Sequence, residues 1–356
     1  MGHTIKHPRR RLSRLALAAL PLLAVLAPAA RAGDPSDTDD QWRTNLLEEN
    51  DSLYTHTDKH YTQGLRLSAL SPLVGEDSWA NDLFDWAQIF PTVFAAGGTR
   101  RVSVFLGQSI FTPVNLDIKP PDPHDRPYGG WLYTGASFLQ ETGKQLENLE
   151  LDLGVVGPGA FGKEVQNDWH QFIGIHQARG WSSQIQNEPG LVLSYERLWR
   201  VPVPFLSRID NGVEDGVDIV PQLGGSGGNV FTYGEAGALL RIGRHLEADY
   251  GPVRIRPALS GTDYFNSEHL GGDLGFYVFA GAQGRVVARN IFLDGNTFRQ
   301  SASVEHKTFV ADLQAGVSVF WSHHARVDLS VVRRTDEFVG QTRQDIIGTA
   351  ALAVSW

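Results

Sequence analysis

The sequence of 356 residues contains no cysteine and a single methionine. Without cysteine the chain cannot form a disulfide scaffold, a thiolate nucleophile or a cysteine-ligated metal site. An excess of basic residues is lacking too, because 31 Lys and Arg stand against 40 Asp and Glu. This acidic balance gives no support for nucleic-acid binding, so we expect no nucleic-acid partner.

Long hydrophobic runs are also missing, apart from one short run near the start. An apolar segment at residues 15–26 follows a basic stretch and precedes the triplet Ala30-Arg31-Ala32. Twelve residues are too few to span a bilayer, and signal peptidase recognises small residues at this spacing. We therefore predict that residues 1–32 are a cleaved signal peptide and that residues 33–356 form one exported domain without a transmembrane helix.

The region after this segment is rich in alternating apolar and polar residues. Every second position from Phe309 to Trp321 is apolar, whereas Asp312, Gln314 and Ser318 lie on the opposite face. Similar alternation occurs in residues 61–68 and 326–331. Strands of about ten residues with one polar face are typical of transmembrane β-barrels, although a water-soluble β-sandwich also alternates.

The aromatic residues favour the barrel over the sandwich. They cluster at the ends of the predicted strands, where membrane barrels carry interfacial girdles. Examples are Trp42, Tyr61, Trp131, Tyr133 and Trp321. The chain also ends in a predicted strand with the aromatic Trp356, as outer-membrane barrels typically do. We therefore predict an all-β fold, a twelve-stranded antiparallel transmembrane β-barrel in a bacterial outer membrane, and we expect a monomer.

Twelve segments carry the strand pattern, an even number as bacterial barrels require. They are residues 41–51, 60–71, 100–109, 129–141, 146–156, 188–200, 216–225, 230–243, 274–290, 303–321, 324–336 and 345–356. If both chain ends are periplasmic, the long connections 110–128 and 157–187 lie outside the cell. The connections 72–99 and 244–273 would then be unusually long periplasmic links.

The first of these long links contains a predicted helix from Trp79 to Phe90. Its apolar residues Trp79, Leu83, Trp86 and Phe90 fall on one stripe at helical spacing. The sequence alone suggests no function for this helix.

Three polar clusters fall on the outer side in this arrangement, and the first joins the first two strands. Asn50-Asp51 ends the first strand with oxygen atoms of the kind that calcium prefers. The same pair favours turns, so an ordinary hairpin explains it equally well. Thr62 shares the face of Arg66 and Ser68 in the second strand, which predicts a side chain in the lumen.

The second cluster spans Lys119 to Trp131 and combines prolines with charged residues. Four prolines stiffen this loop, and Lys119, Asp125 and Arg126 are among its charges. A site for a polar ligand and a merely solvated loop are equally compatible with this composition.

The third cluster follows the glycines of residues 157–162, where the pattern becomes helical. Val165, Trp169 and Phe172 share one stripe, and Gln166 and His170 lie one turn apart on a neighbouring face. A loop helix with an amide and an imidazole together is unusual for a barrel, although a solvated loop plug could carry the same residues.

The chemistry suggested by these clusters is hydrolysis by activated water. A metalloprotease His-Glu-x-x-His motif is absent, and no serine has histidine and asparagine partners by spacing. An imidazole together with carboxylate and amide oxygens suits a histidine that deprotonates water, with a calcium ion that stabilises the oxyanion.

The same segments resemble the outer-membrane lipid A 3′-O-deacylase family over nearly the whole mature chain. The matching pieces are Glu49-Asn50-Asp51, Tyr61-Thr62-Gln63-Gly64, Asp125-Arg126-Pro127-Tyr128, Gly154 to Pro158, Glu164 to Asn167 with His170 and Ile173-Gly174, and Gly224-Gly225 with Gly227-Gly228-Asn229 before Phe231. The helix motif around His170 is the most specific of them.

The resemblance implies a calcium-dependent esterase whose site lies between the barrel wall and a loop helix. Its substrate would be lipid A in lipopolysaccharide, from which it removes the 3′-linked acyloxyacyl chain. By the same resemblance, His170 is the general base that activates water and Gln166 orients it. Asn50 and Thr62 match further polar residues of the family's catalytic site.

The resemblance also implies residues for the metal and for the sugar head. Asp51, with Asn50, would bind calcium, and Lys119 and Arg126 lie where the family places basic residues. One departure concerns position 176, which is histidine here and acidic in the family. Glu164 would then complete the calcium shell, or metal affinity is reduced.

Two other functions remain open from the sequence. A calcium-dependent outer-membrane phospholipase would need a serine nucleophile at the lumen edge. A non-enzymatic barrel, either a channel or an adhesin, would tolerate the loss of His170.

Overall fold

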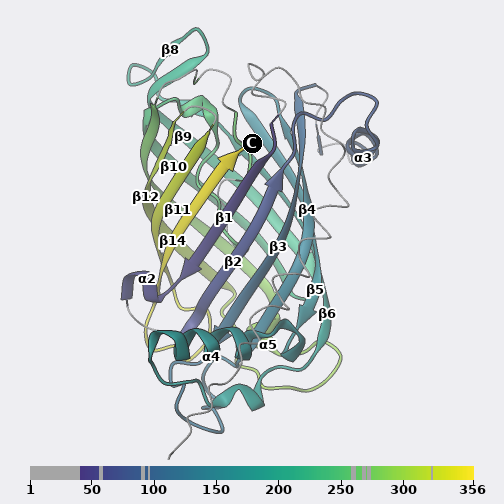
Figure 1. Ribbon diagram of the computed structural model, residues 1–356, viewed down its shortest axis with the longest axis vertical. Helices are drawn as coiled ribbons and strands as arrows, with labels where there is room; N and C mark the ends of the chain where they lie inside the picture. Colours follow the sequence, from purple (N-terminus) through teal and green to yellow (C-terminus); the bar gives the residue numbers. More distant parts are fainter. Residues whose placement is uncertain are drawn as a thin grey trace, which may run out of the picture. The chain divides into compact units, whose positions relative to one another are not determined.

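The computed structural model describes residues 41–55, 59–89, 93–94, 97–257, 262–266, 270, 274–321 and 324–356, so the predicted signal peptide and the residue Phe90 lie outside the described part. Within these ranges, twelve antiparallel strands close into a barrel, as predicted (Figure 1). They are β1 (Arg43–Asn50), β2 (His60–Leu70), β3 (Thr99–Thr112), β4 (Gly129–Glu141), β5 (Gln145–Val156), β6 (Glu188–Trp199), β9 (Val213–Gly228), β10 (Phe231–Arg244), β11 (Leu274–Asn290), β12 (Phe309–Trp321), β13 (Ala325–Arg334) and β14 (Asp345–Ser355).

Strand β1 closes the ring. Its Leu46 lies opposite Leu67 of β2 on one side and Leu352 of β14 on the other. Two short strands, β7 (Val201–Pro202) and β8 (Arg208–Asp210), pair with β9 and were not predicted from the sequence. Their brevity explains this, because two or three residues carry no measurable alternation.

The strand faces follow the predicted alternation. In β12, Asp312 is 1% exposed and its neighbour Leu313 is 57% exposed. Asp328 and Leu329 of β13 show the same contrast. A barrel in lipid needs this pattern, because apolar side chains must face the acyl chains. None of the helices in the described ranges has the length and apolar character needed to cross a membrane.

The two ends of the barrel are distinguished by their helices (Figure 1). The α4 end carries α2 (Ser52–Thr55), α4 (Gly162–Ile173) and α5 (Ile291–Asp294), together with short 3-10 helices at Pro158–Ala160 and Gly180–Ser183. The α3 end carries α3 (Trp79–Ala87), the start of β1 and the end of β14. A third 3-10 helix, Leu246–Ala248, begins the connection from β10 to β11.

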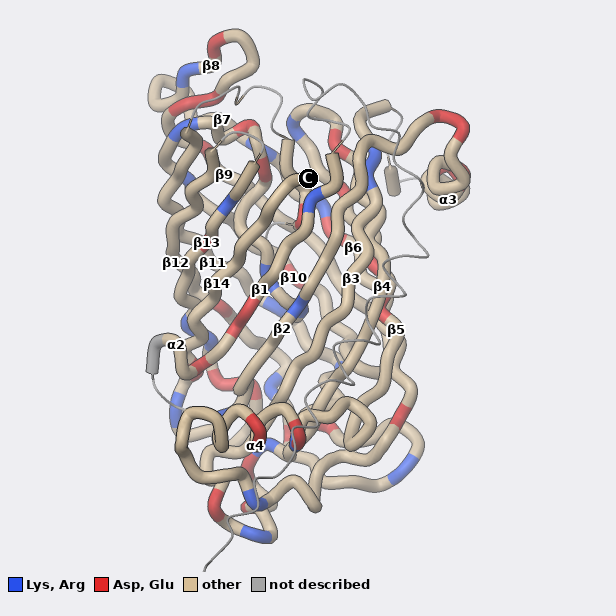
Figure 2. Tube along the Cα trace, in the orientation of Figure 1, with Lys and Arg blue, Asp and Glu red and all other residues tan. Residues whose placement is uncertain are grey.

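That connection enters the lumen in its described part, so it is more than a long link. Arg254 Nε lies 3.1 Å from a carboxylate oxygen of Glu49. Arg256 Nε lies 2.8 Å from Glu150, and its Nη2 lies 2.9 Å from Glu196. Figure 2 marks such acidic and basic positions along the strands as well as in the loops. This segment therefore enters the lumen, where Arg254 and Arg256 pair with three of its carboxylates.

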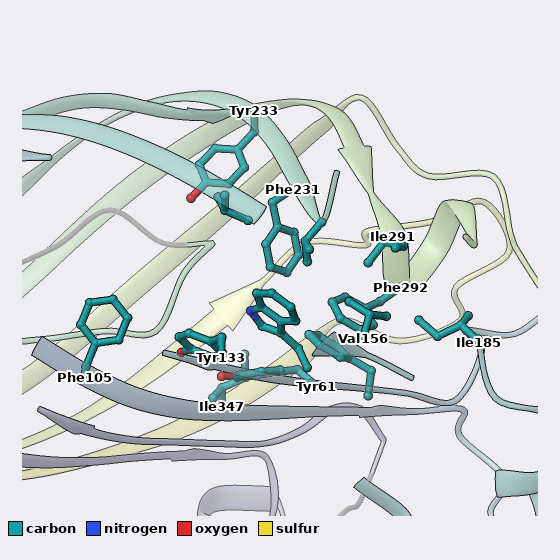
Figure 3. Packing of buried hydrophobic residues seen from close by; sticks show 14 of the residues in the cluster. Tyr61, Phe105, Tyr133, Val156, Ile185, Phe231, Tyr233, Ile291, Phe292 and Ile347 are labelled. Carbon is teal, nitrogen blue, oxygen red and sulfur yellow. The ribbon is translucent and has the colours of Figure 1, made fainter. Parts of the chain in front are cut away.

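An apolar cluster packs inside the barrel toward the α4 end (Figure 3). The Phe111 ring stacks on Phe292 of α5, with centroids 4.0 Å apart, and Tyr61 packs on the other edge at 5.4 Å. Asn290 caps α5 by accepting a hydrogen bond from the Phe292 backbone nitrogen. The cluster closes this part of the lumen, so the functional groups at the α4 end must be sought on the wall and in the loops.

Candidate functional site

Helix α4 carries the two polar residues singled out by the sequence. Gly162, Gln166 and His170 form its buried face, at the predicted spacing of one turn. Gly174 ends the helix with a φ of 79°, a conformation that glycine adopts without steric cost. Because Trp169 is exposed, the helix presents imidazole and amide to the barrel and an aromatic residue to its surroundings.

The helix lies over the outside of the barrel wall. Gln108 of β3 donates a hydrogen bond of 2.6 Å to the carbonyl of Ala160, just before α4. Ile110 of the same strand packs with Trp181, and Val165 of α4 covers this contact. Even-numbered residues of β3 face outward, since the odd-numbered ones are buried toward the lumen. The buried face of α4 is therefore directed to the outer side of the wall, away from the lumen.

Close approach of α4 to the wall depends on Gly162. A Cβ atom at this position would lie 2.8 Å from the ring of Trp181. Trp181 is itself buried and donates from Nε1 to the Oε1 of Gln166 over 2.7 Å. Gln166 thus joins α4 to the loop that follows it, which is a positioning contact in addition to the orientation of His170 that the resemblance implies.

The imidazole of His170 is held by the backbone. Its Nδ1 lies 2.6 Å from the carbonyl oxygen of His176. Because a carbonyl oxygen can only accept, Nδ1 carries the proton and the lone pair of the neutral ring lies on Nε2. The side chain of His176 is exposed, so this residue acts on His170 through its backbone. A buried histidine with this tautomer has the chemistry of a general base.

On the wall, Asn50 and Asp51 form a tight turn at the end of β1. Asn50 Oδ1 accepts from the backbone nitrogen of Ser52 at 2.7 Å and from its hydroxyl at 2.6 Å. Buried Asp51 accepts from the backbone nitrogen of Lys59 at 2.8 Å. Asn50 also donates to Glu48 over 3.4 Å, two residues earlier on the outer face. Asn50 and Asp51 thus form a turn and also supply a buried carboxylate. The interpretation as a hairpin turn and the interpretation as a metal site are therefore compatible.

Thr62 does not share the lumen face of Arg66 and Ser68, and the sequence prediction was wrong on this point. The β2–β3 register shifts between Tyr61 and Gln63, which leaves Thr62 as the extra residue of a β-bulge. Its hydroxyl lies 2.7 Å from that of Thr112, at an even position of β3. The bulge therefore turns Thr62 toward the outer wall, on the side where α4 lies.

The loop of the second cluster is anchored at the same end. Asp125 lies 3.5 Å from Nε2 of His60, and Arg126 donates to Glu337 over 3.0 Å. Arg126 is buried, whereas Lys119 is exposed. Burial alone would raise the pKa of Glu337, but the charges of Arg126 and Arg334 outweigh it and hold that pKa below its ordinary value. Arg126 is thus engaged in joining two loops, and Lys119 is available to solvent.

A calcium ion at this end of the barrel would need other oxygen ligands in addition to carboxylates. Among the described residues, no group of three or more histidine, aspartate or glutamate side chains lies together as a metal site. Glu164 is exposed in the first turn of α4. Calcium also accepts amide and backbone carbonyl oxygens. Asp51 supplies a buried carboxylate suited to such a site. The Oδ1 of Asn50 already accepts two hydrogen bonds from Ser52, so it would have to release one of them to bind the ion.

The structure thus gathers the predicted residues into two groups at one end of the barrel. Asn50, Asp51 and Thr62 lie at the ends of neighbouring strands β1 and β2, and Gln166 and His170 share one face of α4. Thr62 connects the first group to the wall on which α4 packs, because its hydroxyl contacts Thr112 of β3. Sequence reasoning missed Thr112, which lies just beyond the predicted strand 100–109. Extending the predicted strand 100–109 by three residues would have included Thr112 on its outward face.

A glycine-rich stretch imitates a hydrolase motif without forming one. Gly224 to Gly228 matches Gly-x-Ser-x-Gly in spacing. Its Ser226 lies within β9, buried, with its hydroxyl 2.7 Å from Ser194. A nucleophile elbow would need a sharp strand-to-helix turn, so this serine has a structural role.

Comparison with known proteins gives the family. The family model described as outer membrane protein LpxR matches residues 15–356. Among solved structures, LpxR from Salmonella typhimurium is similar with a TM-score of 0.67 and 24% identity over 88% of this chain and 99% of that one. The β domain of the Bordetella autotransporter BrkA follows with a TM-score of 0.38 and 12% identity, over 89% and 98% of the two chains. A search of curated protein sequences found no match.

The Salmonella structure agrees with the fold described above, a twelve-stranded barrel. The family match covers nearly the whole chain and confirms the resemblance predicted from the sequence. The chain belongs to the outer membrane protein LpxR family.

Proposed function

We propose that this outer-membrane protein is a lipid A 3′-O-deacylase in which His170 activates the attacking water. The observation that carries this proposal is the hydrogen bond from His170 Nδ1 to the backbone of His176. This contact supports a basic lone pair on Nε2 of a buried ring, on the side of α4 that faces the barrel wall.

The reaction is the hydrolysis of one ester bond. Nε2 of His170 takes a proton from water as the water oxygen bonds to the ester carbonyl carbon. The tetrahedral intermediate then breaks its bond to the 3-position oxygen of the sugar, and the imidazolium returns the proton to that oxygen. The products are a free acyloxyacyl acid and a sugar hydroxyl, so atoms and protons balance. Asn50 and Thr62 are the polar groups that would position the ester.

A site on the outer wall suits a lipid substrate better than a site in the lumen does. Lipid A lies in the leaflet beside the barrel, and its ester can approach α4 and the adjoining wall by lateral movement. Trp169 and Phe172 on the exposed face of α4 stack with centroids 5.6 Å apart and would contact acyl chains. We propose accordingly that the α4 end faces outside the cell, where lipid A resides.

A calcium ion would be held by Asp51, with Asn50 as the second ligand that the resemblance implies. When bound, it would supply positive charge to the developing oxyanion of the ester. Lys119, exposed at the same end of the barrel, would attract the phosphates of the sugar head.

The decisive experiment is expression in an outer membrane that carries hexa-acylated lipid A, followed by mass spectrometry of the lipid A with and without a calcium chelator. We expect calcium-dependent loss of one 3′ acyloxyacyl group. Unchanged lipid A with a folded barrel would contradict the proposal. Release of fatty acid from phospholipids instead would indicate a phospholipase.

A further inference from the structure

Helix α3 was predicted from the sequence, and the proposed reaction assigns no role to it. It lies at the end of the barrel opposite α4, outside the ring of strands (Figure 1). Ser78 caps its first turn by accepting from the backbone nitrogen of Ala80. The helix is short but well defined, and its sequence of nine residues contains two tryptophans.

One face of α3 packs on the outer wall of the barrel. Phe84 is fully buried, with its ring 5.5 Å from Phe138 and 4.8 Å from Phe94. Val102 of β3 and Leu149 of β5 complete this apolar contact. These wall residues belong to the outward faces of their strands, so α3 covers surface that would otherwise face lipid.

A second face of α3 is polar and is bound by one arginine. Arg100 donates over 2.5 Å to Asn81 and over 2.8 Å to Asp85. Arg100 lies near the start of β3, at the α3 end, and Val102 lies two residues further toward the middle of the membrane. The polar face of α3 is thus directed to the aqueous end of the barrel.

The third face is apolar and exposed. A rotation of about 100° per residue places Trp79, Leu83 and Trp86 within one arc of about 60°. Around the helix axis, Phe84 lies between this arc and the polar face. Trp79 is 62% exposed and Trp86 is 67% exposed. Because Arg100 holds the polar face at the barrel end, this stripe is directed along the wall toward the membrane interior.

The level of α3 on the wall matches a membrane boundary. Val102 contacts the α3 cluster and Ile110 contacts the α4 cluster, both on the outward face of β3. Eight residues at about 3.3 Å each span about 26 Å along the strand, or about 20 Å across a membrane at a tilt of about 40°. An apolar band of about 25 Å is usual for such barrels. The two helices therefore flank the band on the same wall.

We infer that α3 is an interfacial helix that inserts Trp79, Leu83 and Trp86 into the phospholipid leaflet at the α3 end of the barrel. Lipid is the occupant because the exposed stripe continues the lipid-facing wall on which α3 packs. Tryptophan favours the boundary between headgroups and acyl chains, and a helix with apolar and polar faces lies flat there. The insertion of the stripe into lipid stands independently of the deacylase reaction, whereas the choice of the phospholipid leaflet rests on the orientation proposed with that function.

The absence of cysteine allows a direct test. Leu83→Cys and Trp86→Cys are each labelled with a nitroxide in otherwise unchanged protein, which is then folded into vesicles of phosphatidylethanolamine and phosphatidylglycerol. Asp82→Cys, an exposed neighbour outside the stripe, is the matched control. Heat-resistant mobility on gels verifies that each labelled barrel is folded.

We expect collisions with oxygen to dominate at positions 83 and 86, and collisions with a water-soluble nickel chelate to dominate at position 82. The ratio of the two collision rates should invert between the stripe and the control. Equal access of nickel at positions 82 and 83 would place the stripe in water and overturn the inference. Protection of position 83 from both reagents would show that protein covers it, which would overturn the inference as well.

Discussion

Nδ1 of His170 donates to the backbone oxygen of His176, six residues later, over 2.6 Å. The acceptor is a backbone atom that any residue at this position supplies. The histidine at position 176, where the resemblance implies an acidic residue, therefore leaves the orientation of the proposed base intact. The difference affects only the ligands that the exposed side chain can bind.

Substitution of His170 should separate chemistry from folding. We expect His170→Ala to lower deacylation by about a hundred- to ten-thousandfold, the usual contribution of a general base, with heat-resistant gel mobility preserved. His176→Ala is the control, because it keeps the carbonyl, and it should retain most of the activity. The rates are measured by mass spectrometry of lipid A. Normal deacylation by His170→Ala would contradict its role as the base.

Gln166 should act through the position of α4. Gln166→Leu leaves the buried Nε1–H of Trp181 without the acceptor seen here, which costs about 1–3 kcal/mol. We expect slower deacylation and faster proteolysis of residues 157–187. Adding Trp181→Phe removes the stranded donor, so the double variant should lose less than the two single effects combined. The exposed Asp168→Ala on the same helix is the control, and strictly additive losses would argue against the contact.

Calcium dependence should follow Asp51. Chelation should abolish deacylation by the unchanged protein, and readdition of calcium should restore it. Asp51→Asn removes one negative charge from the proposed ligands and should raise the calcium concentration for half-maximal activity by about tenfold or more. Asp122→Asn, an exposed carboxylate at the same barrel end, serves for comparison. An equal shift in both variants would indicate a general charge effect instead of a ligand.

The sequence could predict those features that depend only on the geometry of one strand or one helix. Alternation in residues 309–321 placed Asp312 inside and Leu313 outside, and a spacing of four residues placed Gln166 and His170 on one helical face. Both patterns arise from the geometry of a single strand or helix, so they can be read without tertiary information.

Other features could not be predicted because their cause is not local. The bulge at Thr62 depends on how β2 meets β3, and it reversed the predicted face of that residue. The acceptor for His170 is a backbone carbonyl, which leaves no mark in the sequence. The entry of residues 245–257 into the lumen depends on carboxylates from distant strands, such as Glu49. Those carboxylates appeared in the sequence only as the polar faces of strands.

The charge of Asp312 should be central to the stability of the lumen. Its buried carboxylate lies 2.9 Å from Arg334, 3.4 Å from Arg285 and 3.5 Å from Arg254. Asp312→Asn would leave three buried cations short of one anion, at a cost of about 3–5 kcal/mol. Asp210→Asn removes a similar pair with Arg208 that is exposed, and it should cost at most about 1 kcal/mol. Urea unfolding in lipid vesicles measures both, and equal losses would contradict the difference in burial.

The contact between loops 113–128 and 335–344 should weaken in acid. The charges of Arg126 and Arg334 hold the pKa of Glu337 below its ordinary value despite burial. A carboxyl with a depressed pKa in the folded state stabilises that state above the ordinary value of about 4.3. This contribution is lost as the pH falls below 4.3 and passes through the depressed pKa.

The thermal midpoint of Glu337→Gln should therefore lie below that of the unchanged protein at pH 7, and the gap should narrow as the pH falls below about 4. Other carboxyl groups titrate in both proteins, so the difference between the two curves isolates this residue. Asp122→Asn, whose carboxyl is exposed in the neighbouring loop, should follow the unchanged protein at every pH. A gap that stays constant from pH 7 to pH 3 would show that Glu337 acts by packing, and that its charge does not hold the two loops together.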